Sequence, residues 1–170
     1  MSTTAVMETA EAASRGGKYL TFALGPEEYG LEILKVREII GFMDITAVPH
    51  TPAYVRGVIN LRGQVISVID LRKRFEMPVT DKTELTCIIV VEIKADGRRV
   101  NMGIVVDSVS EVLSIPSASI EDAPSFGTNI DTSFILGMGK LDGKVKILLD
   151  IDRILTSEEV AQLTKRQANN

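Results

Sequence analysis

The sequence is poor in the residues that most often carry chemistry or anchor a small core. Its 170 residues contain no tryptophan, one histidine and one cysteine, and aromatic residues make up 5%. The single cysteine, Cys87, cannot form a disulfide within the chain, which indicates a reducing compartment. Cys87 lies in an apolar run, so we expect a buried and inert thiol. With so few aromatic residues the core must be aliphatic, and its β-branched residues favour strands.

Long apolar segments are also absent. No run reaches the roughly 20 residues needed to cross a bilayer, and residues 1–17 lack the basic and apolar regions of a signal peptide. We therefore expect a cytoplasmic protein that associates with membranes only through a partner. The formal net charge is −4, from 19 basic and 23 acidic residues. This balance argues against binding of nucleic acid without sequence preference.

The sequence offers no constellation of catalytic or metal-binding residues. His50 stands alone in an expected loop, whereas a histidine metal site or a Ser-His-Asp triad needs further placed groups. The glycine-rich segment 137–143 lacks the Gly-Lys-Ser/Thr ending of a P-loop. The acidic residues are scattered, without a paired general acid and base. We predict a protein that is not an enzyme and has no catalytic residues, no metal site and no cofactor.

Short strands and turns are expected to follow a polar N-terminal segment. Residues 1–17, rich in Ala, Ser, Thr and Glu, predict a flexible tail, with a short Ala-rich helix as the alternative. The stretch 29–40 fits either a helical stripe or a strand with a one-turn helix. Asp70 should cap a short helix, and Thr156 with Glu159 predicts a capping box that opens a final helix. The other expected elements are a strand over 19–24, hairpins over 55–69 and 134–149, and a further hairpin made by 85–93 and 99–106.

An internal repeat is the most informative feature of the sequence. Two glycines six residues apart, followed by an aspartate seven residues later, occur twice, and the residues between them agree. The matching positions of this block are Gly57 with Gly137, Leu61 with Leu141, Gly63 with Gly143, Val65 with Val145, Ile69 with Leu149, Asp70 with Asp150, and Leu71 with Ile151. An upstream block pairs Gly30, Val36, Glu38 and Ile39 with Gly103, Val109, Glu111 and Val112.

The repeat predicts two copies of one strand-rich unit, over about 18–75 and 86–155. Each copy would hold about five short strands and a short terminal helix, a size that suits a small barrel without exposed strand edges. Neither copy could bury much core alone, so the two should pack tightly together. The seam between them is a natural groove for a ligand or a partner.

Two basic features are candidates for contacts with partners. The run Arg72-Lys73-Arg74 fits a solvated helix face, with contact to an acidic partner or nucleic acid as the alternative. Arg62 lies at the expected tip of a hairpin, where the turn does not require arginine. Arg62 either pairs with Glu38 or projects to a partner, and these two roles are compatible.

Three blocks of the sequence resemble the CheW-like domain family. The blocks are 52–63 with 68–72, then 103–113, then 135–139 with 148–151. The likeness covers about residues 18–165, with a first barrel unit at about 18–80, a second at about 85–155 and a C-terminal helix at about 157–165. The resemblance implies a mainly β fold of two intertwined five-stranded SH3-like β-barrels with short helices.

The resemblance also implies a function and a set of site residues. The function is that of a chemotaxis adaptor, or scaffold, which couples transmembrane chemoreceptors to the chemotaxis histidine kinase in signalling arrays. The helical hairpin tip of the receptor would lie in the groove between the barrels, and the homologous domain of the kinase would pair with the first barrel. The positions implicated in receptor binding are Val36, Glu38, Gly57 and Arg62, and Ile33 and Ile39 are neighbouring apolar candidates for the same surface. A second kinase contact is suggested at Phe126.

Some alternatives stay open at this point. Phe126 could instead be a loop aromatic packed onto the second barrel. Gly57→Asp is expected to disturb the groove while leaving folding mostly intact. The alternative function is a small-barrel nucleic-acid-binding protein, which the basic run 72–74 favours and which the net charge and scarce aromatic residues oppose.

Overall fold

The computed structural model describes residues 15–95, 97–124, 132–156 and 159. Within these ranges the chain forms short strands, one short α-helix, α2 (Leu71–Arg74), and 3-10 turns. The turns are η1 (Ile33–Lys35), η2 (Ser117–Ser119) and η3 (Ile151–Arg153). The strands are β1 (Gly17–Leu24), β2 (Glu27–Glu32), β3 (Val36–Gly41), β4 (Val55–Leu61), β5 (Gln64–Asp70), β6 (Cys87–Ala95), β7 (Arg98–Val106), β8 (Ser108–Ile115), β9 (Ile120–Glu121), β10 (Ile135–Leu141) and β11 (Lys144–Leu149).

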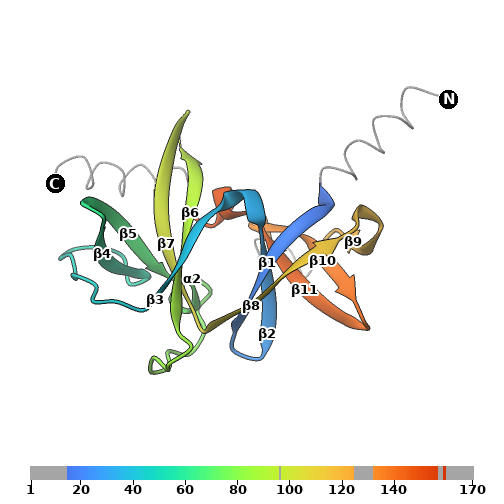
Figure 1. Cartoon of the computed structure of the whole chain (residues 1–170), viewed down its shortest axis with the longest axis horizontal. Coiled ribbons are helices and arrows are strands. Elements are labelled where there is room, and N and C mark those ends of the chain that lie inside the picture. The colour runs from blue at the N-terminus through green and yellow to red at the C-terminus, as the bar shows by residue number, and fades with distance from the viewer. Residues whose placement is uncertain (1–14, 96, 125–131, 157–158, 160–170) are drawn as a thin grey trace.

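The strands form two curved sheets, one toward each side of the view in Figure 1. One sheet has five strands in the order β3-β6-β7-β5-β4, and the other has six in the order β8-β1-β2-β11-β10-β9. Neighbouring strands are antiparallel except for β5 with β7 and β2 with β11, which are parallel. This arrangement confirms the predicted fold class, a mainly β protein with short helices.

Each sheet combines strands from both sequence repeats. The hairpin β1–β2 of the first repeat lies beside β11 of the second, and the hairpin β6–β7 of the second lies beside β5 of the first. The two junctions are equivalent, because Gly30 faces Leu148 in one parallel pair and Gly103 faces Val68 in the other. A Cβ added at Gly30 would lie 2.8 Å from the Leu148 side chain, so the strands approach closely there. The two repeats are intertwined because each contributes a hairpin to the sheet of the other.

A short link of chain connects the two outermost strands of each sheet, and these described strands do not pair with each other. In the five-stranded sheet, Thr46 follows β3 and exchanges two backbone hydrogen bonds of 2.9 Å with Val58 of β4. In the six-stranded sheet, β8 leads through η2 into β9, where Glu121 pairs with Met138 of β10. Among the described strands, β3 does not pair with β4, nor β8 with β9. The barrels are therefore less regularly closed than the predicted ones.

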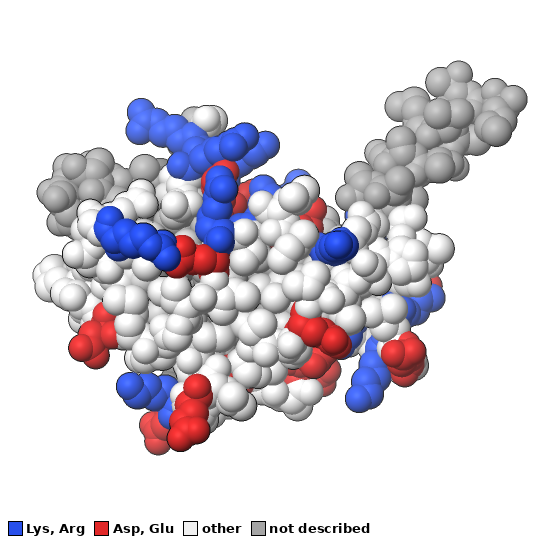
Figure 2. All heavy atoms as spheres, viewed as in Figure 1, with Lys and Arg blue, Asp and Glu red and all other residues white. Residues whose placement is uncertain are grey.

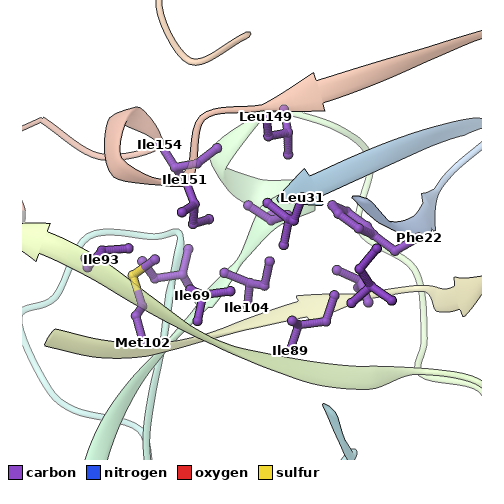
Figure 3. Packing of buried hydrophobic residues seen from close by; sticks show 14 of the residues in the cluster. Phe22, Leu31, Ile69, Ile89, Ile93, Met102, Ile104, Leu149, Ile151 and Ile154 are labelled. Atoms are coloured by element: carbon purple, nitrogen blue, oxygen red, sulfur yellow. The ribbon is translucent and has the colours of Figure 1, made fainter. Parts of the chain in front are cut away.

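Apolar clusters from both sheets form the core. One cluster comes from the five-stranded sheet and includes Ile59 and Val68, and another comes from the six-stranded sheet and includes Tyr19 and Leu148. The largest lies between the sheets, as Figure 3 shows. Side chains of both repeats therefore fill the seam, as expected for units too small to be stable alone. Members of the central cluster that Figure 3 labels include Phe22, Leu31, Ile69, Ile89, Ile104 and Leu149.

Several local predictions are confirmed. The stretch 29–40 contains the end of β2, then η1 and β3, so the interpretation as a strand with a one-turn helix is the correct one. Asp70 accepts a backbone N–H of α2 at 3.3 Å, as a cap does. Thr156 N–H donates to the Glu159 carboxylate at 2.8 Å, and Glu159 N–H donates to Thr156 Oγ1 at 3.1 Å, which is the predicted capping box. The rest of the predicted C-terminal helix and residues 1–14 of the predicted tail lie outside the described residues.

Candidate functional site

The strand β3 carries three of the six candidate residues at one edge of the five-stranded sheet. The pairing of β3 with β6 changes register between Val36 and Glu38, so one extra residue bends the strand there. Val36 packs against the central core, whereas Ile39 is 46% exposed. Ile33, in the turn just before β3, is half-buried against the same core. The candidate residues on this edge therefore present a partly exposed apolar surface.

Arg62 and Glu38 form a bidentate ion pair. Arg62 Nη1 and Nη2 donate to Glu38 Oε2 and Oε1 at 2.6 and 3.0 Å. These hydrogen bonds lower the pKa of Glu38, so the carboxylate stays ionised. The pair joins the β4–β5 turn to β3, which confirms the predicted contact between these residues. The Arg62 side chain is still 73% exposed, so the pair is also accessible to a partner.

The turn that carries Arg62 has a shape that glycine and asparagine adopt more readily than arginine. Arg62 has a φ of 51° and Gly63 a φ of 85°, as in a two-residue type I′ hairpin. Asn60 supports the turn, because its Oδ1 accepts the Gly63 N–H at 2.8 Å. A left-handed conformation costs a non-glycine residue about 1 kcal/mol. Asp142 holds the same place in the other repeat, with a φ of 53°, in the Asp-Gly pair that such turns favour.

Gly57 is buried and supports the site from within. Its φ is 140°, and an added Cβ would lie 2.0 Å from the carbonyl oxygen of Thr46. Thr46 is the residue that closes the sheet against Val58, so any side chain at position 57 would push this link away. The geometry thus argues against the expectation that Gly57→Asp leaves folding mostly intact.

One exposed apolar residue of this surface escaped the sequence analysis. Leu34, in η1, is 92% exposed and adjoins Ile33. The signal was present, since Ile33, Leu34 and Val36 cannot all face one core from a single helical turn. Leu34 is therefore a second exposed apolar residue, beside Ile39, in the segment formed by η1 and β3. The suggested kinase contact, Phe126, lies outside the described residues.

The second repeat presents a similar apolar position with different charges. Val112 is equivalent to Ile39 and is 49% exposed. At the two positions of the ion pair, however, the second repeat has Glu111 and Asp142. Two acidic side chains cannot form an ion pair. The bidentate pair is therefore a property of the five-stranded sheet, although the fold around it occurs twice.

A pocket of about 500 Å³ opens between the six-stranded sheet and the end of α2 with the residues that follow it. Part of its wall is a series of stacked rings, with centroids 5.1 to 6.0 Å apart. None of the six candidate residues lines this pocket. This pocket and the residues expected to bind the receptor are thus separate features. Residues of the pocket wall include Tyr29, Phe75, Met77, Phe134, Ile147 and Ile154.

The arginines of the basic run 72–74 are used inside the molecule. Arg72 donates from Nε and Nη2 to the Asp107 carboxylate at 2.8 and 2.6 Å. Arg74 donates from Nε to the Ile154 carbonyl oxygen at 2.9 Å and lies over the Tyr54 ring. The prediction of a solvated helix face was therefore wrong for these two residues. The observation that favoured nucleic-acid binding loses its basis as well.

Charges of both signs are interspersed on the face that Figure 2 shows. Basic side chains gather mainly at the free end of the β6–β7 hairpin. There Arg37 and Arg99 both form ion pairs with Glu92. This acidic residue offsets part of the positive charge, so the face lacks the continuous basic surface that nucleic-acid binding requires.

Other chemistry is sparse in the described ranges. Cys87 is buried, as predicted, and burial raises the pKa of its thiol. The described residues contain no group of three or more His, Cys, Asp or Glu side chains that could hold a metal ion. Among the helices described, none has the length and apolar character needed to span a membrane.

Comparison with known proteins joins this geometry to a family. Residues 18–159 match the family model of the CheW-like domain. The chain belongs to the CheW-like family. The chemotaxis protein CheW of Klebsiella aerogenes is 44% identical over 146 residues, which are 86% of each chain. The chemotaxis protein CheW of Rhizobium meliloti is 36% identical over 151 residues, which cover 88% of this chain and 95% of the relative.

A solved structure in the CheW-like family has the same fold. The crystal structure of the scaffolding protein TtCheW from Thermoanaerobacter tengcongensis superposes with a TM-score of 0.74 at 40% sequence identity. The match covers 85% of this chain and 97% of that one. The family and the names of these relatives assign the chain to the chemotaxis scaffolds.

Proposed function

We propose that this CheW-like protein is an adaptor that couples transmembrane chemoreceptors, the methyl-accepting chemotaxis proteins, to the chemotaxis histidine kinase. The observation that carries the proposal is the match to a scaffolding protein over 97% of that chain. The protein in that structure is described as a scaffolding protein, a role that rests on binding surfaces. It would work in the cytoplasm and reach the membrane only by recruitment to receptor arrays.

The receptor surface in this proposal is the edge of the five-stranded sheet. Ile33, Val36 and Ile39 would supply apolar contacts to the helical hairpin tip of the receptor. Glu38 and Arg62 would supply polar contacts, and their exposed ion pair can exchange its internal hydrogen bonds for bonds to the receptor. The geometry adds Leu34 to this surface, since it is 92% exposed beside Ile33.

Gly57 has an indirect role in the proposed surface. It is buried, and its lack of a side chain lets Thr46 close the sheet behind β3 and β4. A substitution at Gly57 would weaken receptor binding by displacing this support. The loss of binding would then be accompanied by a loss of stability, which distinguishes Gly57 from Arg62.

The kinase would bind elsewhere on the protein. Its regulatory domain is homologous to this chain and would pair with the first barrel, and a second contact at Phe126 would link complexes into arrays. Information would pass through geometry alone, because a scaffold transmits receptor state only if its contacts differ between two receptor states.

Reconstitution tests the proposal. Membranes containing a chemoreceptor are mixed with the histidine kinase and increasing amounts of this protein, and kinase autophosphorylation is measured with and without the receptor ligand. We expect kinase activity to rise to a plateau with added protein and to come under ligand control. No effect at saturating protein would refute the proposal.

The two hairpin tips provide a matched pair of variants for this assay. Arg62→Asp gives the first tip the Asp-Gly turn that the second tip already has, so this variant should fold. Asp142→Arg makes the reverse change at the equivalent position. We expect Arg62→Asp to lose receptor control and Asp142→Arg to keep it. Equal behaviour of the two variants would remove Arg62 from the receptor surface.

A further inference from the structure

The bulge in β3 decides which face of the five-stranded sheet each receptor candidate takes. Val36 is opposed by Val91 of β6. Ile39, three residues later, is opposed by Ile89, which is only two residues from Val91. Opposed residues of an antiparallel pair point to the same face, and both residues of β6 belong to the central cluster. Val36 and Ile39 therefore share the face of that cluster, although residues three apart in a regular strand point to opposite faces.

Glu38 takes the other face for the same reason. It is opposed by Val90, which belongs to the cluster of the five-stranded sheet. The register leaves Arg37 as the extra residue of the bulge, with no opposed residue on β6. A slip by one residue turns the side chains of a strand over. Regular pairing of β3 would therefore turn either Val36, or both Glu38 and Ile39, to the opposite face.

Ion pairs hold the extra residue against the sheet. The guanidinium of Arg37 pairs with one carboxylate oxygen of Glu92 on β6, and Nε of Arg99 on β7 lies 3.4 Å from the other oxygen. The contacts thus span three neighbouring strands. The Glu92 side chain is 17% exposed, against 52% for Arg37. A carboxylate that is mostly buried is screened less than an exposed one, so this pair can tie β3 to β6 at the bulge.

The second repeat has a bulge at the equivalent place, held by a different contact. The register of β8 against β1 shifts around Thr21. Thr21 is fully buried, and its hydroxyl donates to the carbonyl and accepts the N–H of Glu111, at 2.9 and 3.2 Å. The residue at the corresponding place on β6 is Val90, which has no hydroxyl. The bulge of β3 lacks such a bond, and the ion pair of Arg37 with Glu92 connects the strands there instead.

We propose that Arg37 and Glu92 are positioning residues of the receptor surface. Their ion pair keeps the extra residue of β3 at position 37. The bulge in turn keeps Val36 and Ile39 on one face and Glu38 on the other, beside the β4–β5 turn. Arg37 and Glu92 act on the receptor contacts through the backbone of β3 and need not touch the receptor. This inference rests on the proposed function, because it concerns the same surface.

Binding of the full chain to membranes that contain a chemoreceptor tests the inference. Arg37→Gln and Glu92→Gln each break the ion pair, and they change the net charge in opposite directions. We expect both to weaken receptor binding by a similar factor, about fivefold. The double variant should bind like either single variant, because the pair can be broken only once. Arg37→Lys keeps the positive charge and should bind within about twofold of the native protein.

NMR of the free variants measures the position of β3 without the receptor. Ile39 and Ile89 are opposed in the native register, so cross-strand NOE contacts between them report on the bulge. We expect these contacts to weaken in both glutamine variants, while the rest of the spectrum stays native-like and shows that the variants fold. Arg98→Gln, at an exposed position of β7, loses the same charge as Arg37→Gln. This control should keep both the NOE contacts and receptor binding.

The outcomes separate this inference from the proposed function. If the native protein did not bind the receptor membranes, the proposed function would be wrong, and this inference with it. If the native protein bound and both glutamine variants bound equally well, or kept the native NOE contacts, the inference alone would be wrong. An effect of Arg37→Gln that Glu92→Gln does not share would also overturn it, since Arg37 would then contact the receptor directly.

Discussion

Arg72 and Asp107 form a bidentate ion pair, with Nε and Nη2 of the arginine 2.8 and 2.6 Å from the two carboxylate oxygens. Asp107 Oδ2 also accepts the backbone N–H of Gly25 at 2.8 Å. The pair thus connects three places that are distant in sequence: α2, the junction of β7 with β8, and the turn between β1 and β2. Since β1–β2 belongs to the six-stranded sheet and β7 to the five-stranded one, Asp107 ties the sheets together.

The second repeat has a comparable link with the charges exchanged. Asp152 is the residue equivalent to Arg72, and its Oδ2 accepts from Lys35 Nζ at 2.7 Å. Asp152 Oδ1 accepts the backbone N–H of Lys94 at 3.0 Å, beside the turn between β6 and β7. Both halves therefore have an ion pair at this junction, with the charge at the equivalent position reversed.

Asp107→Asn should destabilise the protein by about 2 kcal/mol, the usual contribution of a hydrogen bond to a charged group. The amide retains the shape but loses the charge that two Arg72 nitrogens share. Urea denaturation measures the free energy of unfolding, and Arg72→Gln with the double variant completes a cycle. A coupling energy near zero would show that Asp107 acts through Gly25 alone.

The same pair predicts a dependence of stability on pH. The hydrogen bonds from Arg72 hold the pKa of Asp107 below its ordinary value, which is about 3.9 in an unfolded chain. The stabilisation is therefore complete above about pH 4 and is lost as the pH falls through the lower folded pKa. The difference in unfolding free energy between the native protein and Asp107→Asn should shrink between pH 5 and pH 2. A constant difference over this range would contradict the assignment.

The sequence repeat predicted the elements of the fold but not how they are exchanged. Matching glycines and aspartates located both copies of the β4–β5 type of hairpin, because turns and caps depend on local sequence. The hairpins β1–β2 and β6–β7 could equally have paired within their own repeats. Their exchange depends on long-range packing, such as that of Gly30 against Leu148, for which one sequence provides no signal.

The candidate site shows the same limit. Pairing with Glu38 is one of the two roles that the sequence left open for Arg62, and the pair exists. The burial of Gly57 against Thr46 was not predictable, since the link that closes the sheet contains no recognisable motif. The internal use of Arg72 likewise follows from tertiary packing, which local patterns do not encode.

Gly57→Ala should cost at least about 2 kcal/mol of stability. Its Cβ would lie 2.0 Å from the Thr46 carbonyl oxygen, so both hydrogen bonds between Thr46 and Val58 would be disturbed, in addition to backbone strain. Gly63→Asn is the control, because no atom lies within 4 Å of the added Cβ and asparagine tolerates this turn. We expect the control to lose less than about 1 kcal/mol. If Gly57→Ala and Gly63→Asn lost similar stability in thermal denaturation, the cost at position 57 would come from its backbone conformation and not from the contact with Thr46.

Thr21→Val should be more destabilising than Thr21→Ser. Thr21 is fully buried opposite a bulge of β8, where its hydroxyl donates to the Glu111 carbonyl at 2.9 Å and accepts the Glu111 N–H at 3.2 Å. Valine keeps the volume but leaves both groups without this partner, at a cost of about 2 kcal/mol. Serine keeps the hydroxyl and loses one methyl group, worth about 0.8 kcal/mol. Urea denaturation ranks the two, and the opposite order would show that packing matters more than the hydrogen bonds.

Exchange of the charges of Glu38 and Arg62 separates the two roles of this pair. The single variants Glu38→Arg and Arg62→Glu place like charges together, and both should lose receptor control of the kinase. The double variant restores an ion pair between the turn and β3, although with its polarity reversed. If the pair acts only by holding β3 in place, the double variant should regain receptor control. If the receptor contacts these charged side chains directly, as proposed, the double variant should still fail to restore receptor control in the reconstituted kinase assay. Circular dichroism should show that this variant folds like the native protein.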